Sequence, residues 1–256
     1  MTMLSWFSAD LHIHTVLSPC AELDMGPINI VETARELKID IIGITDHNAA
    51  GNVAAVMERA GQEGPVVLPG MEVQTREEVH ILCFFPDMEQ LQAYAAYIRE
   101  RLPPVRNRPE VFGDQVVVNA REEILYFEEI LLVNSVTASL EEVVQEALAQ
   151  DGLVIPAHVD RGAFSIMANL GLIPPSLPVA ALEVAWPEKL PDLLLRYPAV
   201  GKYPLVSFSD AHTLSQFRAG YRTYFYLKEP TFKEIKKALQ GEGGRKVVIR
   251  QAAGSG

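Results

Sequence analysis

Residues 9–14, ADLHIH, form a short apolar run that contains two histidines separated by one position. Alternate residues of a β-strand project from the same face of a sheet, so the rings of His12 and His14 can reach a single metal ion. The motif by itself is a weak signal, because two hydrogen-bonded polar side chains at a strand end would give the same pattern. The remainder of the chain decides between these two interpretations.

The association of an apolar run with a metal-ligating residue type recurs along the chain. The further examples are His47 after 40–45, Glu72 after 65–70, His80 within 79–85, His158 after 153–157, and Asp210 with His212 after 204–209. Buried imidazoles and carboxylates cost free energy unless they are paired or bound to metal. The repetition therefore favours a metal centre over separate structural roles, and it includes all six histidines of the chain.

Short apolar runs alternate with helical patterns, which is typical of βα units and of an α/β fold with a largely parallel sheet. The predicted strands cover 9–14, 40–45, 65–70, 79–85, 153–157, 180–186, 204–209, 221–227 and 246–250. Helices are expected after the capping or first-turn residues Pro27, Asn48, Asp87, Ser139 and Thr231, the last two with capping boxes to Glu142 and Glu234. A loop is expected over 101–118, followed by a helical run over 119–134. Ligands gathered at the carboxyl ends of strands are also characteristic of barrel enzymes.

Length and composition narrow the class of protein. A chain of 256 residues with 48% hydrophobic content suits one large domain, which we predict to span residues 1–256. Its net charge of −11 repels phosphate backbones and anionic membranes, so long nucleic acid and membranes are not expected partners. The beginning of the chain, MTMLSWFSADLH, has neither a basic segment nor a long apolar one, which predicts a cytoplasmic protein. Cys20 and Cys83 are expected to be reduced.

The ordered motifs resemble the PHP family, the polymerase and histidinol phosphatase superfamily. They are DLHIHT (10–15), ITDH (44–47), GMEV (70–73) with His80, PAH (156–158) and SDAH (209–212). The resemblance extends from about residue 9 to residue 212, in the family's order. It implies a distorted (β/α)7 barrel that holds two or three divalent metal ions, zinc, manganese or iron, and hydrolyses phosphate esters.

Position by position, the resemblance implies a first ion bound by His12, His14, Glu72 and Asp210. Glu72 would bridge to a second ion bound also by His80 and His158, and a third ion would use His47 and His212. Many members add a ligand from the loop after the HxH motif, where this chain has Cys20 or a neighbour in TVLSPC (15–20). Cys20 is either a thiolate ligand, which would favour zinc or iron, or a small buried apolar residue beside a weak third site. Cys83 is expected in the core.

Three further charged residues are candidates for catalytic roles. Asp46 could ligate metal, orient the His47 imidazole through its other nitrogen, or cap a helix. Arg161, in HVDR (158–161), is the first candidate for a contact to the phosphate and Arg218 the second, because a guanidinium matches phosphate bidentately. A surface salt bridge is the alternative for both arginines.

Two neighbouring ions can lower the pKa of a bridging water and neutralise a phosphoryl transition state. The expected reaction is therefore hydrolysis of a phosphomonoester of a small metabolite or nucleotide by a metal-bridged hydroxide. A 5′-end nuclease or nucleotide phosphoesterase acting on short oligonucleotides is the alternative enzyme. A non-catalytic PHP module that stabilises a partner is the alternative from another class, and metal content distinguishes it from an enzyme.

Overall fold

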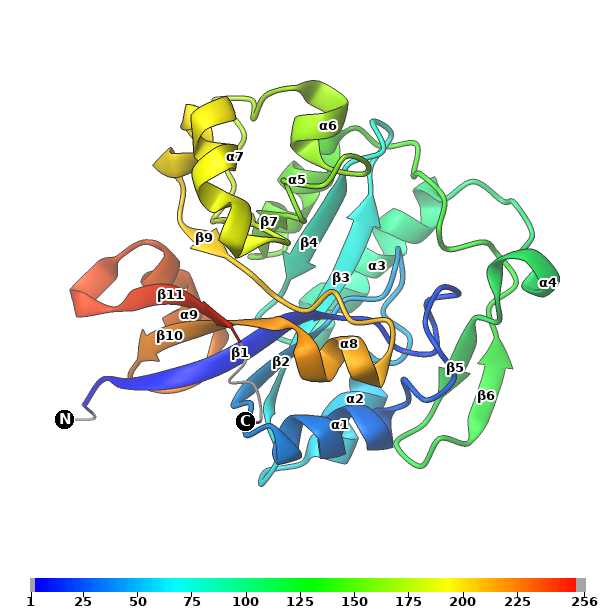
Figure 1. The fold of residues 1–256 in the computed structure, drawn as a ribbon. Helices are drawn as coiled ribbons and strands as arrows, with labels where there is room; N and C mark the ends of the chain where they lie inside the picture. Colours follow the sequence, from blue (N-terminus) through cyan, green and yellow to red (C-terminus); the bar gives the residue numbers. More distant parts are fainter. Residues whose placement is uncertain (1–2, 252–256) are drawn as a thin grey trace.

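The computed structural model describes residues 3–251, which form an α/β fold around a curled seven-stranded sheet (Figure 1). The order of its strands across the sheet is β11 (Lys246–Gln251), β10 (Tyr221–Leu227), β1 (Ser5–Ile13), β2 (Ile41–Ile44), β3 (Val66–Gln74), β4 (His80–Phe84) and β7 (Leu153–Pro156). Two small sheets accompany it, one of β5 (Val116–Val118) with β6 (Ile124–Phe127) and one of β8 (Leu182–Glu183) with β9 (Leu205–Val206). All nine predicted strands are present.

The main sheet is mixed, so the prediction of a largely parallel sheet is wrong. β1, β2 and β3 run parallel, but β4 is antiparallel to both β3 and β7, and β10 is antiparallel to both β1 and β11. The reason for the first reversal is local. Only residues 75–79 separate β3 from β4, whereas a parallel connection needs a dozen residues or more.

Helices flank the sheet and follow most of the predicted start signals (Figure 1). Their bounds are α1 (Pro27–Glu36), α2 (Val53–Ala60), α3 (Met88–Arg101), α4 (Pro109–Phe112), α5 (Leu140–Ala149), α6 (Ile166–Leu170), α7 (Leu190–Arg196), α8 (Leu214–Ala219) and α9 (Phe232–Leu239). Asp87 accepts two backbone hydrogen bonds at the start of α3, and Ser139 forms the predicted capping box on α5. None of the helices within residues 3–251 combines the length and the apolar character needed to cross a bilayer.

Two capping predictions change. Asn48 does not cap α2; its side chain donates to the carbonyls of Leu132 and Asn134 at 2.7 and 2.8 Å. Thr231 does cap α9, but the carboxylate of Glu234 does not close a capping box. The Glu234 carboxylate instead forms a buried ion pair with Arg245, and each of its oxygens lies 2.7 Å from a guanidinium nitrogen. In both cases a distant partner outweighs the local hydrogen bond.

The helix predicted over 119–134 is wrong, because this segment contains a turn and the second strand of the β5–β6 hairpin. The side chain of Asn119 accepts the backbone N–H groups of Arg121 and Glu123, which closes the turn. The buried Asn52 also bonds the carbonyl of Val116 and the N–H of Val118, so it fixes β5 against the body of the protein. The predicted loop over 101–118 accordingly contains α4 and β5.

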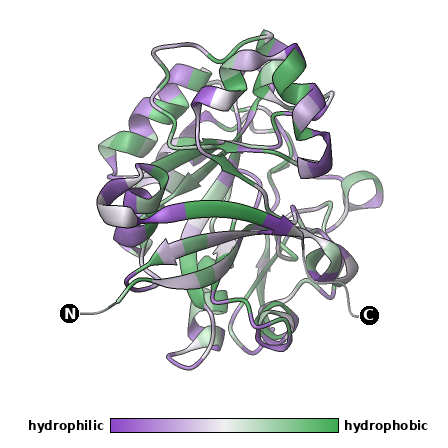
Figure 2. Ribbon diagram, turned by 60° about the vertical axis from the view of Figure 1, so that its left-hand side comes forward, coloured by the Kyte–Doolittle hydropathy of each residue, from purple (hydrophilic) through white to green (hydrophobic). Residues whose placement is uncertain are grey.

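Apolar side chains fill both faces of the main sheet. One group of buried residues includes Ile42, Val73 and Val144, and another, on β1, β4 and β10, includes Leu11, Phe84 and Phe225. The central strands are accordingly hydrophobic along much of their length, whereas the helices alternate hydrophobic and hydrophilic residues (Figure 2). This packing fixes the strands on both sides and so positions the residues at their ends.

Candidate metal centre

The six histidines, Glu72 and Asp210 converge at one edge of the main sheet. His12 lies in β1, His14 directly follows it, His47 follows β2, and Glu72 lies in β3. Because β4 runs antiparallel to β3, its first residue, His80, lies at the same edge. His158 follows β7, and Asp210 with His212 follows β9. The strand connections therefore bring together residues that are up to two hundred positions apart in the sequence.

Glu72 lies at the centre of the cluster. Its Oε1 is 3.3 Å from Nε2 of His12, 3.0 Å from Nδ1 of His80 and 3.4 Å from Nε2 of His158. Its Oε2 is 3.4 Å from Nε2 of His14 and 3.0 Å from Nδ1 of His47. One buried carboxylate thus faces five imidazole rings, as the bridging role implied by the resemblance requires.

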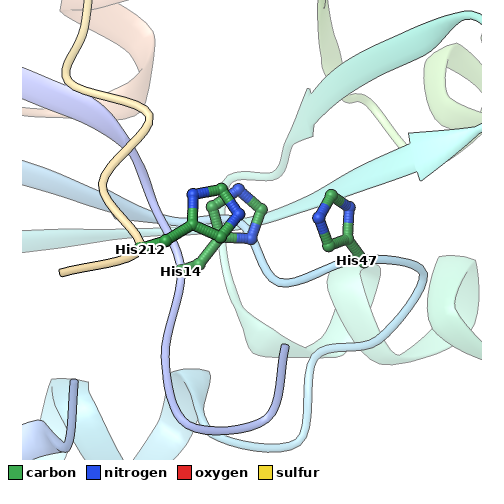
Figure 3. A group of neighbouring side chains, drawn as sticks. All are labelled: His14, His47 and His212. Atoms are coloured by element: carbon green, nitrogen blue, oxygen red, sulfur yellow. The ribbon is translucent and has the colours of Figure 1, made fainter. Parts of the chain in front are cut away.

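Asp210 extends the cluster toward its open side. Its Oδ1 is 3.1 Å from Nε2 of His12 and 3.3 Å from Nε2 of His14. The ring of His212 stacks on that of His14 with 4.0 Å between centroids, and the ring of His47 lies 4.5 Å from that of His14 (Figure 3). Three sets of ligand atoms are close enough to share an ion: His12, His14 and Asp210; His47, Glu72 and His80; and His14, His47 and His212.

Hydrogen bonds on the outer side of the rings fix their tautomers. The carboxylate of Glu183 is 3.0 Å from Nδ1 of His12, so this nitrogen carries the proton and donates it to Glu183. The hydroxyl of Ser18 donates to Asp46 and therefore accepts the proton on Nδ1 of His14, 3.0 Å away. Both Nε2 atoms are left with lone pairs directed at the carboxylates of Glu72 and Asp210.

Such an arrangement needs a cation. Within the part of the chain that the structure describes, five buried atoms of the cluster have no hydrogen-bond partner: Nε2 of His12, Nε2 of His14, Nδ1 of His47, Oε2 of Glu72 and Nδ1 of His158. Lone pairs that face carboxylate oxygens at 3.1–3.4 Å repel one another unless a proton or a metal ion lies between them. Imidazole nitrogens with carboxylate oxygens form a donor set that zinc, manganese and iron accept. The residues therefore fit the divalent ions that the sequence predicts.

The pKa values of the clustered side chains also favour positive charge at the centre. Burial lowers the pKa of His12, but the carboxylates of Asp210, Glu183 and Glu72 outweigh burial and raise it well above its ordinary value. Burial together with His212 and His47 lowers the pKa of His14 well below its ordinary value. Burial raises the pKa of Glu72, but His80, His12 and His47 outweigh this effect and lower it. The cluster thus holds its carboxylates charged and attracts positive charge to its centre.

Glu183, in β8, is a residue of the candidate site that the sequence did not reveal. Besides holding His12, it accepts the backbone N–H of His158 at 2.9 Å, so one buried carboxylate orients two parts of the cluster. A carboxylate that accepts the second ring N–H of a ligating histidine fixes its orientation and raises its basicity. The available signal was a charged residue inside the apolar run AALEVAW (180–186).

Asp46 is fully buried and faces the loop after β1. It accepts the N–H and the hydroxyl of Thr15, both at 2.7 Å, and the hydroxyl of Ser18 at 2.7 Å. The predicted contact of Asp46 with the ring of His47 is absent among these hydrogen bonds. Instead, Asp46 acts on His14 through Ser18, whose hydroxyl also accepts the backbone N–H of His47 at 3.2 Å.

Cys83 is buried in the core, as predicted, whereas Cys20 is exposed at the rim of the cluster, so the alternative of a small buried apolar residue is wrong. Burial raises the pKa of the Cys20 thiol, but hydrogen bonds with His212 and His47 outweigh it and lower this pKa to about 6. These two histidines are the ones that the resemblance assigns to the third ion.

Arg161 and Arg218 differ in their surroundings. Nη1 of Arg161 is 2.6 Å from Oδ2 of Asp210, at the mouth of the cluster. Nη2 of Arg218 is 2.7 Å from Glu36 on the surface, which is the salt bridge that was the alternative for this residue. A cavity of about 510 Å³ opens over the cluster, and its lining includes His47, Glu72, His158, Arg161 and Trp186. Arg161 is therefore the arginine that a bound anion can reach.

Backbone strain marks two of the ligand positions. His158 and Asp210 adopt φ values of +30° and +48°, a region that non-glycine residues rarely occupy. Such conformations cost about 1–3 kcal/mol each and persist where the surrounding structure holds them, often at functional sites. The packing around β7 and β9 therefore stabilises an orientation that serves the cluster.

Solved structures of hydrolytic enzymes share this fold. Endonuclease Q of Pyrococcus furiosus is 21% identical, with a TM-score of 0.72 over 95% of this chain and 58% of that protein. An amidohydrolase of Chromobacterium violaceum, solved with sulfate and no metal, is 21% identical, with a TM-score of 0.58 over 96% of this chain and 98% of that one. A two-domain protein of Bacteroides vulgatus with a predicted PHP-like metal-dependent phosphoesterase is 15% identical, with a TM-score of 0.56 over 97% of this chain and 66% of that one.

The similarity to endonuclease Q covers only part of that protein. The chain spans only 58% of the length of endonuclease Q, which has also been solved with a 27-mer duplex carrying an abasic lesion. No curated protein matches the chain in sequence. The family model described as the PHP domain matches residues 10–145, slightly more than half of the 256 residues. With the motifs, the fold and the ligand cluster in agreement, the chain belongs to the PHP domain family.

Proposed function

We propose that this protein is a metal-dependent phosphoesterase that hydrolyses phosphate monoesters of small metabolites or nucleotides. The observation that carries the proposal is the buried carboxylate of Glu72, which faces the nitrogens of five histidines at 3.0–3.4 Å and is bordered by Asp210. Such a donor set suits a group of divalent ions far better than it suits a structural hydrogen-bond network.

The proposed ligands are those that the resemblance implies. His12, His14, Glu72 and Asp210 would hold one ion, Glu72 with His80 and His158 a second, and His47 with His212 a third. When bound, these ions would supply positive charge to the phosphate oxygens and lower the pKa of a water between them. The protein's own contribution is to hold the rings in place through Glu183, Ser18 and Asp46.

Arg161 is the proposed phosphate-binding residue. Its side chain is 37% exposed toward the cavity, and Asp210 engages only Nη1. The remaining guanidinium donors can bind two oxygens of a phosphate side by side. Asp210 would thus fix the arginine at the entrance while its other donors orient the ester over the cluster.

Hydrolysis of short oligonucleotides is a second candidate function. It is supported by the likeness in fold to endonuclease Q, a lesion-specific nuclease. The net charge of −11 weighs against long nucleic acid as the substrate of this chain. A non-catalytic module that binds no metal is the remaining alternative. It would not explain why polar atoms of the cluster are buried without hydrogen-bond partners among the described residues.

The test is a panel of phosphorylated metabolites, nucleotides and short oligonucleotides offered to protein reconstituted with zinc, manganese or iron. The control is the His12→Ala variant prepared in the same way. We expect two or three metal equivalents per chain and release of phosphate by the wild-type protein only. Absence of bound metal would favour the non-catalytic module, and activity that persists in the variant would reveal a contaminant.

Glu183 offers a test of the support around His12. The Glu183→Gln variant is expected to bind its ions about 10–100-fold more weakly, because an amide holds the imidazole less firmly than a carboxylate does. Metal affinity is measured by competition with a chromophoric chelator. The exposed Glu229→Gln is the matched control. An unchanged affinity in Glu183→Gln would contradict the orienting role.

Cys20 is the proposed additional ligand of the third ion, because it lies beside His47 and His212, which lower the pKa of its thiol to about 6. Protein reconstituted with cobalt(II) is expected to show a sulfur-to-metal absorption band in the near ultraviolet. The Cys20→Ser variant should lose this band and bind one ion fewer, whereas Cys83→Ala, at the chain's other cysteine, should keep it. A band that survives in Cys20→Ser, or that never forms, rules out the thiolate ligand.

A further inference from the structure

A second cavity of about 520 Å³ adjoins the cavity of about 510 Å³ over the histidine cluster, which we call the metal cavity. The two cavities share Arg161, Gly162 and Trp186 as lining residues, so these residues form the boundary between them. The second cavity extends from this boundary toward α7. Lys189 and Arg196 line the second cavity but not the metal cavity. A ligand with one end over the metal cluster can therefore place its other end in the second cavity.

The lining of the second cavity carries charges of both signs. Lys189 and Arg196 line it, and neither forms an ion pair with any residue in the described range 3–251. Two carboxylates also line it, Asp160 and Asp192. The two oxygens of Asp160 accept the N–H groups of Ala185 and Trp186 at 2.7 and 2.8 Å, and within residues 3–251 neither carboxylate forms an ion pair with Lys189 or Arg196.

A neighbouring carboxylate is also directed elsewhere. Glu188, next to Lys189 in the chain, accepts the hydroxyl of Tyr221 at 2.7 Å and does not line the cavity. Lys189 and Arg196 are exposed, so the ammonium and guanidinium groups are accessible to a ligand in the second cavity. An anionic group that enters the cavity can therefore pair with a cationic side chain.

The remaining lining is apolar and aromatic. Val159, Met167 and Leu193 contribute aliphatic surface, and the exposed ring of Trp186 stands at the boundary with the metal cavity. Nζ of Lys189 lies 4.5 Å from the centre of this ring, which holds the ammonium group beside it. An apolar or planar group that passes Trp186 would bring an attached anion close to Lys189.

We infer that the second cavity binds the leaving group of the substrate, and that this leaving group carries a second anionic group. The inference rests on the proposed phosphoesterase activity. The ester phosphate would lie over the metal cluster with Arg161, an apolar or aromatic body would contact Trp186, and a carboxylate or second phosphate would bind Lys189 and Arg196. The substrate class is therefore a phosphate ester with two separated anionic groups.

The test uses two matched pairs of esters that differ only in the second anion and in length. They are phenyl phosphate with 4-carboxyphenyl phosphate, and biphenyl-4-yl phosphate with 4′-carboxybiphenyl-4-yl phosphate. For each pair, the ratio of kcat/KM values is compared between the wild-type protein, Lys189→Ala, Arg196→Ala and the double variant. Taking a ratio of ratios cancels the effect of the carboxylate on the intrinsic reactivity of the ester.

We expect the preference for the carboxylated member of at least one pair to fall by about tenfold for each lost cation, because a charge-assisted hydrogen bond contributes roughly this much. Lys233→Ala, an exposed lysine of α9, should leave the preference unchanged. A preference that persists in the double variant, or no preference by the wild-type protein in either pair, overturns the inference. Failure of the wild-type protein to hydrolyse any of the four esters overturns the proposed function on these substrates and the inference with it.

Discussion

Replacement of Glu72 by glutamine is expected to lower kcat/KM by roughly a thousandfold or more, the scale on which preorganised charge contributes to catalysis. Glu72 is the carboxylate that faces five imidazoles with both oxygens, and the amide would present one weak acceptor and one hydrogen-bond donor. The donor of glutamine would point at ring nitrogens or at the ions themselves. The second ion should therefore be lost together with the activity.

The measurement pairs phosphate release with metal analysis of the purified variant. Glu63→Gln, in the exposed loop after α2, is the matched control and should keep both activity and metal content. Circular dichroism establishes that Glu72→Gln is folded. A folded variant with full metal content and near-normal kcat/KM would disprove the central role of Glu72.

Removal of the bound ions with a chelator is expected to lower the Tm by about 10 °C, because ions present at a thousandfold excess over their Kd contribute about 4 kcal/mol to the folded state. The physical reason is the four buried nitrogens and one carboxylate oxygen of the cluster that have no hydrogen-bond partner among the described residues. Repulsion between the charged carboxylates of Glu72 and Asp210 adds to the effect, since both contact the same ring of His12.

Thermal unfolding followed with and without chelator measures this contribution, and addition of zinc or manganese should restore the original Tm. In Glu72→Gln, which is expected to bind fewer ions, the chelator should have a smaller effect. An identical Tm for metal-loaded and chelated wild-type protein would show that the cluster is stable without cations.

Much of the candidate metal centre could be predicted because its signals are local. Each ligand lies within a few residues of a strand end, and strand periodicity places His12 and His14 on one face without any knowledge of the rest of the fold. The strands themselves were readable for the same reason, as runs of buried apolar residues. Motif order then provided the fold family, and the family model supports it over residues 10–145.

The residues that support the ligands were harder to find because their partners are remote. Glu183 meets His12 across 171 positions, and Asp46 reaches His14 only through Ser18, which is 28 positions away from it. Nothing near position 183 indicates which ring its carboxylate will meet. The same holds for Lys189 and Arg196. Their proposed role depends on the second cavity, which has Trp186 in common with the metal cavity.

The sequence by itself determined the ligand types, their strand-end positions and the α/β class, since each follows from hydrophobic periodicity and from the cost of burying polar groups. Only the tertiary structure decided the antiparallel placement of β4, the β5–β6 hairpin in place of a helix, the tautomers of His12 and His14, and the second cavity. These features depend on contacts between distant segments, such as Asn52 with Val116 and Val118. The free energy of such contacts outweighs the local preference for helix or strand. It depends on both segments of a contacting pair, so it cannot be inferred from either segment alone.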